Sequence, residues 1–134
     1  VRLQTTSGDI ILQLAPDRAP VTVENFIQYV ESDHYVGTVF HRVIEDFMIQ
    51  GGGYDQKDLK KEKPTQKPIK NESDNGLRNY KYTIAMARTS EPNSASSQFF
   101  INTADNRSLD RDYAGGDGYG YCVFGKVIQG MEVV

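Results

Sequence analysis

Residues 39–53 read VFHRVIEDFMIQGGG, and this stretch determines how we interpret the rest of the chain. β-Branched and aromatic residues dominate on both sides of the acidic pair Glu45-Asp46, a pattern that suits the pleated surface of a sheet. We therefore predict two short strands joined by a tight turn. The three glycines at 51–53 end the second strand.

Strand alternation predicts which side chains of this hairpin share a face. The expected sets are Phe40, Arg42 and Ile44, then Met48 and Gln50, then Phe47 and Ile49. The cation of Arg42 and the amide of Gln50 stand in apolar surroundings, where an unpaired buried polar group would cost stability, so their presence calls for an explanation. The pattern leaves two interpretations open: a surface strand whose arginine keeps its charge in water, or a functional site that uses this arginine.

Length and composition indicate an ordinary globular protein. A chain of 134 residues fits one domain, residues 1–134, with one hydrophobic core. Its 38% hydrophobic and 25% charged residues are typical of soluble proteins, and its net charge of −3 gives no general attraction to nucleic acid. No apolar run approaches the roughly 20 residues of a membrane span, and no leader pattern is visible at Val1. We expect a cytoplasmic monomer that binds neither nucleic acid nor membrane.

The remaining periodicities predict many short strands and few helices. Strands are expected at 1–5, 9–14, 82–87, 98–102 and 121–127, a helix at 20–32, and the opening of a further helix at 130–134. The helix at 20–32 follows from apolar residues at the spacing i, i+3, i+4 and i+7, namely Val23, Phe26, Ile27 and Val30. Such a mixture indicates a mainly β barrel or sandwich.

A long polar segment, residues 54–79, separates the hairpin from the next predicted strand. It holds six lysines between Lys57 and Lys70, which is compatible with a nucleic-acid patch. Interleaved acidic residues such as Asp58 and Glu62, and the lack of stacking aromatics, favour a solvated loop. A loop of this length is usually functional or mobile, and its role stays open.

Two glycine-containing motifs lack residues that their chemistry would need. Residues 120–127 approach the spacing of a phosphate-binding loop, but Val127 stands where a hydroxyl group must reach Mg²⁺. Residues 110–115 resemble the start of a calcium loop, but Ala114 and Tyr121 replace two of the oxygen ligands. We therefore reject both sites.

The residues that usually carry hydrolytic chemistry show no recognisable pattern either. His34 and His41 lack the local ligand spacing of a zinc site. Cys122 is the only cysteine and sits in an apolar run, which fits a small buried hydrophobe better than a nucleophile. We predict no metal site.

Several further blocks resemble one protein family when they are taken together with the opening stretch. The blocks are FHRVI and FMIQGG at 40–44 and 47–52, AMAR at 85–88, SQFFI at 97–101, VFGKV at 123–127, and the first hairpin followed by APVTVENF at 19–26. In this order they closely resemble the cyclophilins, a family of peptidyl-prolyl cis-trans isomerases. The ending QGGG at 50–53 and the run YCVF at 121–124 are more similar to prokaryotic-type members.

The resemblance implies a closed antiparallel eight-stranded barrel with a helix capping each end. In the family the final strand pairs with the first, and a chain ending at Val134 would lack the second helix and this strand. We therefore expect an incomplete barrel with an exposed strand edge.

The reaction that the resemblance implies is rotation about the peptide bond before proline. Amide resonance gives that bond a barrier of about 18–20 kcal/mol, so rotation without a catalyst is slow. No covalent bond breaks, and neither a nucleophile nor a cofactor is required. By resemblance Arg42 is the catalytic residue, because a permanently charged guanidinium can draw the prolyl nitrogen lone pair out of conjugation.

The resemblance also implies which residues hold a Pro-containing polypeptide. The expected set is Phe47, Met48, Phe100 and Leu109 around the proline ring, Gln50 and Gln98 along the flanking peptide, the backbone of Ala87 and Arg88, and Tyr121 where members often have histidine. Strand alternation separates Phe47 from Met48, and we follow the family because Phe47 directly follows the acidic turn. Many members have an aromatic residue, often Trp, in place of Ser108, so we expect weaker binding of cyclosporin-type cyclic peptides.

Two other functions remain as alternatives. A non-catalytic cyclophilin-fold module or chaperone would bind Pro-containing segments without turnover, and an exposed barrel edge would favour it. A nucleotide-binding domain rests only on the rejected glycine motifs. The presence of Arg42 together with Phe47, Gln50 and Phe100 favours an isomerase that assists protein folding.

Overall fold

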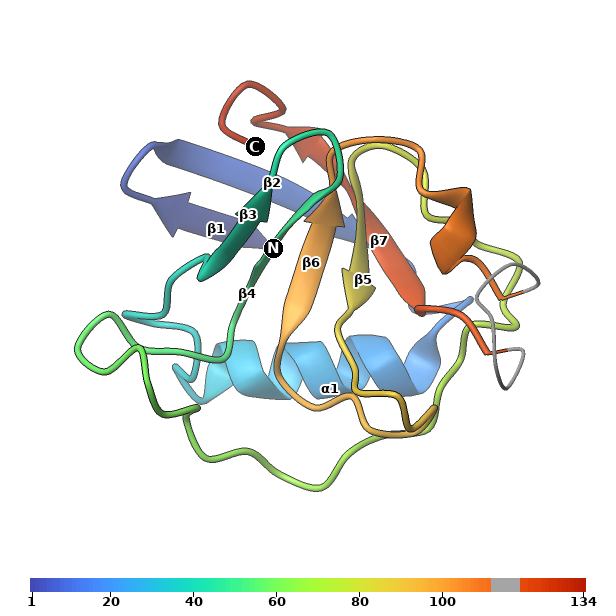
Figure 1. Ribbon diagram of the computed structural model, residues 1–134, viewed down its shortest axis with the longest axis horizontal. Helices are drawn as coiled ribbons and strands as arrows, with labels where there is room; N and C mark the ends of the chain where they lie inside the picture. The colour runs from blue at the N-terminus through green and yellow to red at the C-terminus, as the bar shows by residue number, and fades with distance from the viewer. Residues whose placement is uncertain (112–118) are drawn as a thin grey trace.

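The computed structural model of the protein describes residues 1–111 and 119–134. Its elements in chain order are β1 (Arg2–Thr5), β2 (Gly8–Leu14), α1 (Pro20–Glu31), β3 (Arg42–Ile44), β4 (Met48–Gly51), β5 (Thr83–Met86), β6 (Phe99–Asn102), the 3₁₀ turn η1 (Arg107–Leu109) and β7 (Val123–Gln129). The strands form one antiparallel sheet of seven in the order β1-β2-β7-β5-β6-β4-β3 (Figure 1). The fold is thus mainly β, as the sequence predicted.

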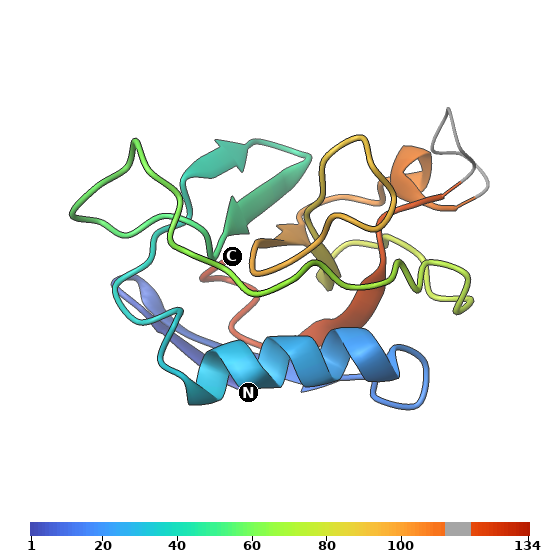
Figure 2. The same cartoon turned by 90° about the horizontal axis from the view of Figure 1, so that it is seen from below.

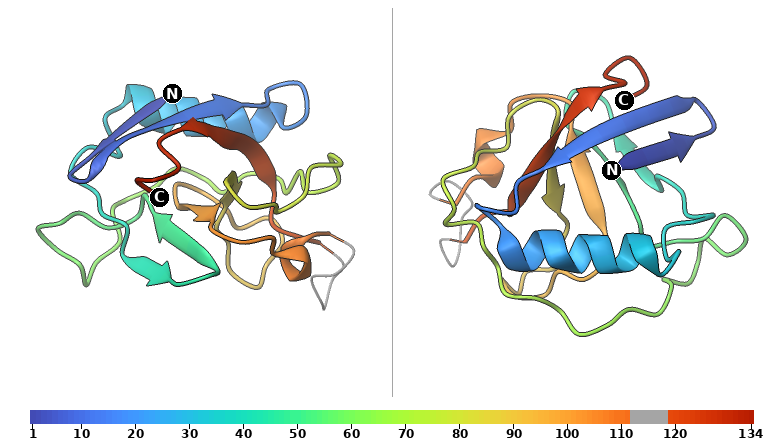
Figure 3. Two further views of the ribbon diagram at one scale, coloured as in Figure 1. Left: turned by 90° about the horizontal axis from the view of Figure 1, so that it is seen from above. Right: turned by 180° about the vertical axis from the view of Figure 1, so that it is seen from behind.

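The sheet curls into a half-barrel, and α1 lies across one end of the curl (Figure 2). Because β1 and β3 are the outer strands of the described sheet, they lie on the two sides of its opening (Figure 3). The closed eight-stranded barrel implied by the resemblance is therefore not what these residues form. The described residues contain one α-helix.

Most elements expected from periodicity are confirmed, but the first strand of the hairpin is shorter than expected. The expected strand over the first half of the hairpin is reduced to β3, which begins only at Arg42. Residues 130–134, where we expected the opening of a helix, form one turn that is assigned no helix: the Val133 and Val134 N–H groups donate to the Gly130 carbonyl at 2.9 and 3.3 Å. The long segment 54–79 contains no helix or strand, as expected for a loop.

Strand alternation gives the sheet two apolar faces. The inner cluster, which packs with α1, includes Ile10, Leu12, Val23, Phe26, Ile49, Ile84, Phe99, Ile101 and Phe124. The outer cluster consists of the buried residues Met48, Ala85, Phe100 and Val123 with the partly buried Phe47, Leu77, Ala87, Leu109 and Tyr121. Neighbours in the chain, such as Phe99 and Phe100, belong to different clusters because successive side chains of a strand point to opposite faces.

Two residues of the hairpin depart from strict alternation. Phe40, expected beside Arg42, packs on Phe99 of the inner cluster with ring centroids 5.9 Å apart, because β3 does not extend back to it. Phe47, which alternation places away from Met48, lies with Met48 in the outer cluster, as the family resemblance implied. It precedes β4 and follows Asp46, whose φ of 56° turns the chain before the strand begins.

The region of the rejected phosphate-binding motif is a strand, because residues 123–129 form β7. Cys122 is a buried free cysteine, and its burial raises the pKa of the thiol to about 11, which fits an inert hydrophobe. The rejected calcium loop lies mostly at 112–115, outside the described residues. Among the residues that the structure does describe, no helix is long and apolar enough to cross a bilayer.

Candidate active site

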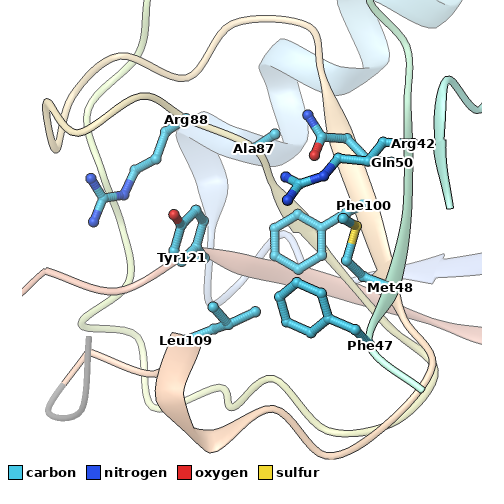
Figure 4. Close-up of a pocket in the computed structure, with 9 residues that line it drawn as sticks. All are labelled: Arg42, Phe47, Met48, Gln50, Ala87, Arg88, Phe100, Leu109 and Tyr121. Carbon is cyan, nitrogen blue, oxygen red and sulfur yellow. The ribbon is translucent and has the colours of Figure 1, made fainter. Parts of the chain in front are cut away.

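A cleft of about 120 Å³ opens on the outer face of the sheet (Figure 4). Its lining residues are Arg42, Phe47, Met48, Gln50, Ala87, Arg88, Phe100, Leu109 and Tyr121. They come from β3, the turn before β4, β4 itself, β6, η1 and the segments that follow β5 and precede β7. The structure thus brings together every residue expected at the site except Gln98.

The floor of the cleft is apolar. Met48 and Phe100 are each 3% exposed, while Phe47 and Leu109 remain partly exposed at its sides. Tyr121 meets Phe100 in an edge-on arrangement, with ring centroids 5.7 Å apart. The volume is far below that of a drug-sized pocket and suits one small apolar ring.

Arg42 brings a positive charge to the edge of this floor. It lies directly across from Gln50 in the β3–β4 pair, and Figure 4 shows its guanidinium directed over the cleft. Among the described residues, the Arg42 guanidinium has no hydrogen-bond or ion-pair partner. Because arginine stays protonated at any ordinary pH, its fixed set of donors is available to a ligand.

A network of asparagine side chains holds Phe47 in place. The Asn106 amide donates to the Phe47 carbonyl at 2.8 Å, and the Thr103 N–H donates to the same oxygen at 3.0 Å. Asn106 also donates to Asn102, which is fully buried and donates in turn to Asn79 at 3.0 Å. Sequence reasoning missed this network, because its partners lie up to 59 positions apart along the chain.

The Arg88 side chain turns away from the cleft and holds its wall. Its guanidinium donates to the carbonyls of Tyr119 at 3.0 Å and Thr89 at 3.0 Å, with a longer bond to Gly120 at 3.3 Å. It also stacks over the Tyr121 ring, 4.9 Å from the centroid. The cation is thus engaged by the segment that carries Tyr121, and only the backbone of Arg88 remains for a ligand.

Gln98 lies behind Gln50 instead of in the cleft. The Gln50 amide donates to the Gln98 side-chain oxygen at 2.9 Å, and the Gln98 amide donates to the Glu62 carboxylate at 3.0 Å. Gln98 and Glu62 line a neighbouring cavity of about 400 Å³ that shares Gln50, Ala87 and Arg88 with the cleft. Sequence reasoning did not assign Glu62 to the site, since nothing local marks a contact across 36 positions.

His41 and Ser108 border the site without lining it. Burial and the adjacent Arg42 charge lower the pKa of His41, and its ring packs on Tyr54 with centroids 4.6 Å apart. Histidine therefore adds no positive charge beside Arg42 at neutral pH. Ser108 lies exposed in η1, next to Leu109, and adds no aromatic wall.

Comparison with known proteins shows the family of the chain. The family described as "Cyclophilin type peptidyl-prolyl cis-trans isomerase/CLD" matches residues 1–134. A peptidyl-prolyl cis-trans isomerase of Streptomyces antibioticus is 56% identical over 134 residues, covering 100% of this chain and 80% of the relative. An Escherichia coli peptidyl-prolyl cis-trans isomerase B is 50% identical, with the same two coverages of 100% and 80%.

Solved structures show the same fold. A cyclophilin-type isomerase of Cryptosporidium parvum, crystallised in the presence of the dipeptide Ala-Pro, superposes with a TM-score of 0.78 at 29% identity. The superposition covers 98% of this chain and 79% of that one. A cyclophilin from Hirschia baltica, at 24% identity and a TM-score of 0.80, shows the fold alone and is covered to 64%.

The chain belongs to the cyclophilin-type peptidyl-prolyl cis-trans isomerases. As an enzyme it is therefore an isomerase of this type, and its bacterial relatives at 50–58% identity agree with the prokaryotic character read from the sequence.

The pKa values of the two histidines predict how stability depends on pH. Burial lowers the pKa of both His34 and His41 below 6.5, so the fold favours their neutral forms. Their contribution to stability is present above about pH 6.5 and is lost as pH falls through the lowered pKa values. The free energy of unfolding, measured in urea, should be smaller at about pH 5.5 than at about pH 7.5.

The variant His34→Gln is the control for that experiment, because glutamine keeps a donor toward the Gly52 carbonyl but does not titrate. It should lose less stability on acidification than the parent protein. An equal loss of unfolding free energy in both proteins would contradict a contribution of His34 to the pH dependence.

Proposed function

We propose that the cleft binds the proline of an X–Pro segment and that Arg42 catalyses rotation about the bond before it. The observation that carries this proposal is the Arg42 guanidinium, which has no partner among residues 1–111 and 119–134, at the edge of an apolar cleft sized for one ring. The protein would then accelerate isomerisation in unfolded or flexible polypeptides and so assist folding, which X–Pro rotation often limits.

The proposed catalysis is electrostatic. Rotation ends amide conjugation and leaves the nitrogen lone pair free to accept a hydrogen bond, which a planar ground state does not offer. A guanidinium held at the cleft edge would donate to that nitrogen in the twisted state only. A hydrogen bond to a charged group is worth roughly 1.5–3 kcal/mol, or about 10- to 150-fold in rate. Desolvation and orientation of the ring in the cleft would supply the rest.

The other site residues would hold the ligand. We propose that the proline ring rests on Met48 and Phe100 between Phe47 and Leu109, with Tyr121 closing the rim. Gln50 would contact the flanking peptide, and Gln98 would do so through Gln50. Since the Ala87 N–H already donates to the Gln98 carbonyl at 3.0 Å, the strand-like contact would use the Ala87 carbonyl and the Arg88 N–H.

The Cryptosporidium parvum relative, crystallised in the presence of Ala-Pro, supports Pro-containing ligands for this chain as well. Cyclosporin-type cyclic peptides would bind weakly, because the exposed Ser108 offers no aromatic wall. The net charge of −3 supports an absence of nucleic-acid partners. We further propose a monomer in a reducing compartment such as the cytoplasm, since the one cysteine is buried and free.

We also propose that an eighth strand closes the barrel between β1 and β3, with a second capping helix. These two strands are the outer strands of the described sheet, and exposed apolar residues mark the β3 side: Val43 is 67% exposed and Ile44 37%. An unpaired apolar edge of this kind is a site for strand addition.

The variant Arg42→Ala tests the catalytic proposal. We expect kcat/KM for a Pro-containing peptide to fall roughly 10- to 150-fold, the value of one charge-assisted hydrogen bond made in the transition state. Arg42→Lys should recover part of this loss, because lysine keeps the charge but not the planar set of donors.

Arg2→Ala is the matched control, since Arg2 lies in β1 and pairs with Asp9 at 3.8 Å, away from the cleft. It should leave the rate unchanged. Equal rates for Arg42→Ala and the parent would refute the proposed mechanism and favour a binding module without turnover.

The variant Ser108→Trp tests the ligand preference. A tryptophan in η1 would add an aromatic surface beside Leu109 and should tighten cyclosporin binding by about 10-fold or more. The chain has no tryptophan, so the fluorescence of the introduced Trp would report the titration. Ser7→Trp, in the turn before β2, is the control. Calorimetry would measure binding by the parent protein. Tight binding by the parent would contradict the role assigned to Ser108.

A further inference from the structure

Two hydrogen bonds connect residues 54–79, the lysine-rich loop, to the cleft. The Gln98 Nε2 donates to Glu62 Oε1 at 3.0 Å, and the Gln50 Nε2 donates to Gln98 Oε1 at 2.9 Å. Glu62 lies in the segment 54–79, Gln98 immediately precedes β6, and Gln50 lines the cleft from β4. We call this chain of three side chains the Glu62 relay.

The Glu62 carboxylate sets which group donates and which accepts in both hydrogen bonds of the Glu62 relay. An ionised carboxylate only accepts hydrogen bonds, so Gln98 must turn its NH₂ group toward Glu62. Its oxygen then faces Gln50, which must in turn present its own NH₂ group. Without the carboxylate, the side-chain amides of Gln98 and Gln50 could each be turned by 180° with no change of shape. A hydrogen bond between them would form in either orientation. With it, the Gln50 oxygen is left as the free acceptor on the cleft side.

Neighbouring contacts hold the Glu62 end and the middle of the relay. Lys63, the next residue after Glu62, donates from its backbone N–H to the Gly53 carbonyl at 2.8 Å and from its ammonium group to the His34 carbonyl at 2.6 Å. A Cβ atom at Gly53 would lie 2.5 Å from Gln98 Cγ, so a glycine is needed where the Gln98 side chain crosses. The backbone beside Glu62 and the path of the Gln98 side chain are therefore fixed by their surroundings.

We propose that Glu62 is a positioning residue: it fixes the Gln50 oxygen as an acceptor for a backbone N–H of the peptide that flanks the bound proline. This inference rests on the proposed function of the cleft. It assigns a role to one residue of the lysine-rich loop, whose function the sequence left open. Since the contact is made to the flanking peptide in both ground and transition states, Glu62 should act on binding more than on turnover.

The variant Glu62→Gln tests this role, because it keeps the size of the side chain but allows both amide directions. With an uncharged Pro-containing peptide, KM should rise roughly 3- to 10-fold while kcat changes little, as expected for one exposed charge-assisted bond. Glu91→Gln removes a carboxylate that is also exposed and that, within the described residues, accepts no hydrogen bond, and it should leave KM unchanged.

A double-mutant cycle separates the relay from a general charge effect. In the background of Gln98→Ala, the change Glu62→Gln should have no further effect, since the connection is already broken. Additive effects would overturn the proposal. A fall in kcat at constant KM would also overturn it, because it would place the effect on Arg42.

Side-chain NMR provides a readout that does not depend on activity. In the free protein, Glu62→Gln should shift the NH₂ signals of both Gln98 and Gln50, whereas Glu91→Gln should shift neither. Unchanged signals would refute the relay even if Arg42 proves catalytic. Shifted signals in a protein whose Arg42→Ala variant is fully active would leave the relay intact and refute the proposed function instead.

Discussion

The alternation of side chains along the central strands is the constraint on which the rest of the structure depends. In β6, Phe99 and Ile101 fill the half-barrel, so Phe100 between them must face outward. The same rule in β4 buries Ile49 inside and turns Met48 and Gln50 outward. Core packing on one face therefore helps to hold the cleft residues in position on the other.

Polar contacts then hold individual cleft residues in place on the sheet. The asparagine network holds the Phe47 backbone, the Arg88 guanidinium holds the segment of Tyr121, and the Glu62 carboxylate holds Gln98 and Gln50. Arg42 stands apart from these, since it has no described partner. A site in which the supporting groups are paired and one cation is free is suited to stabilising charge that develops only during bond rotation.

The sequence predicted the elements well, because apolar spacing at 23–30 and the β-branched runs are local signals. It predicted the cleft largely through the family resemblance, as Phe47 shows: alternation alone assigned it to the wrong face. Glu62 and the side-chain role of Arg88 could not be predicted, because their partners are distant in the chain and carry no periodic pattern. The closure of the barrel likewise depends on pairing that no described residue makes.

The central claim is that the outer cleft holds the proline ring while the bond before it rotates. Two-dimensional NMR on a Pro-containing peptide with a small amount of protein tests it directly. We predict exchange peaks between the cis and trans forms of the peptide, together with intermolecular contacts from the proline ring to Met48 and Phe100. Exchange that is accelerated without such contacts, or contacts without exchange, would contradict this claim.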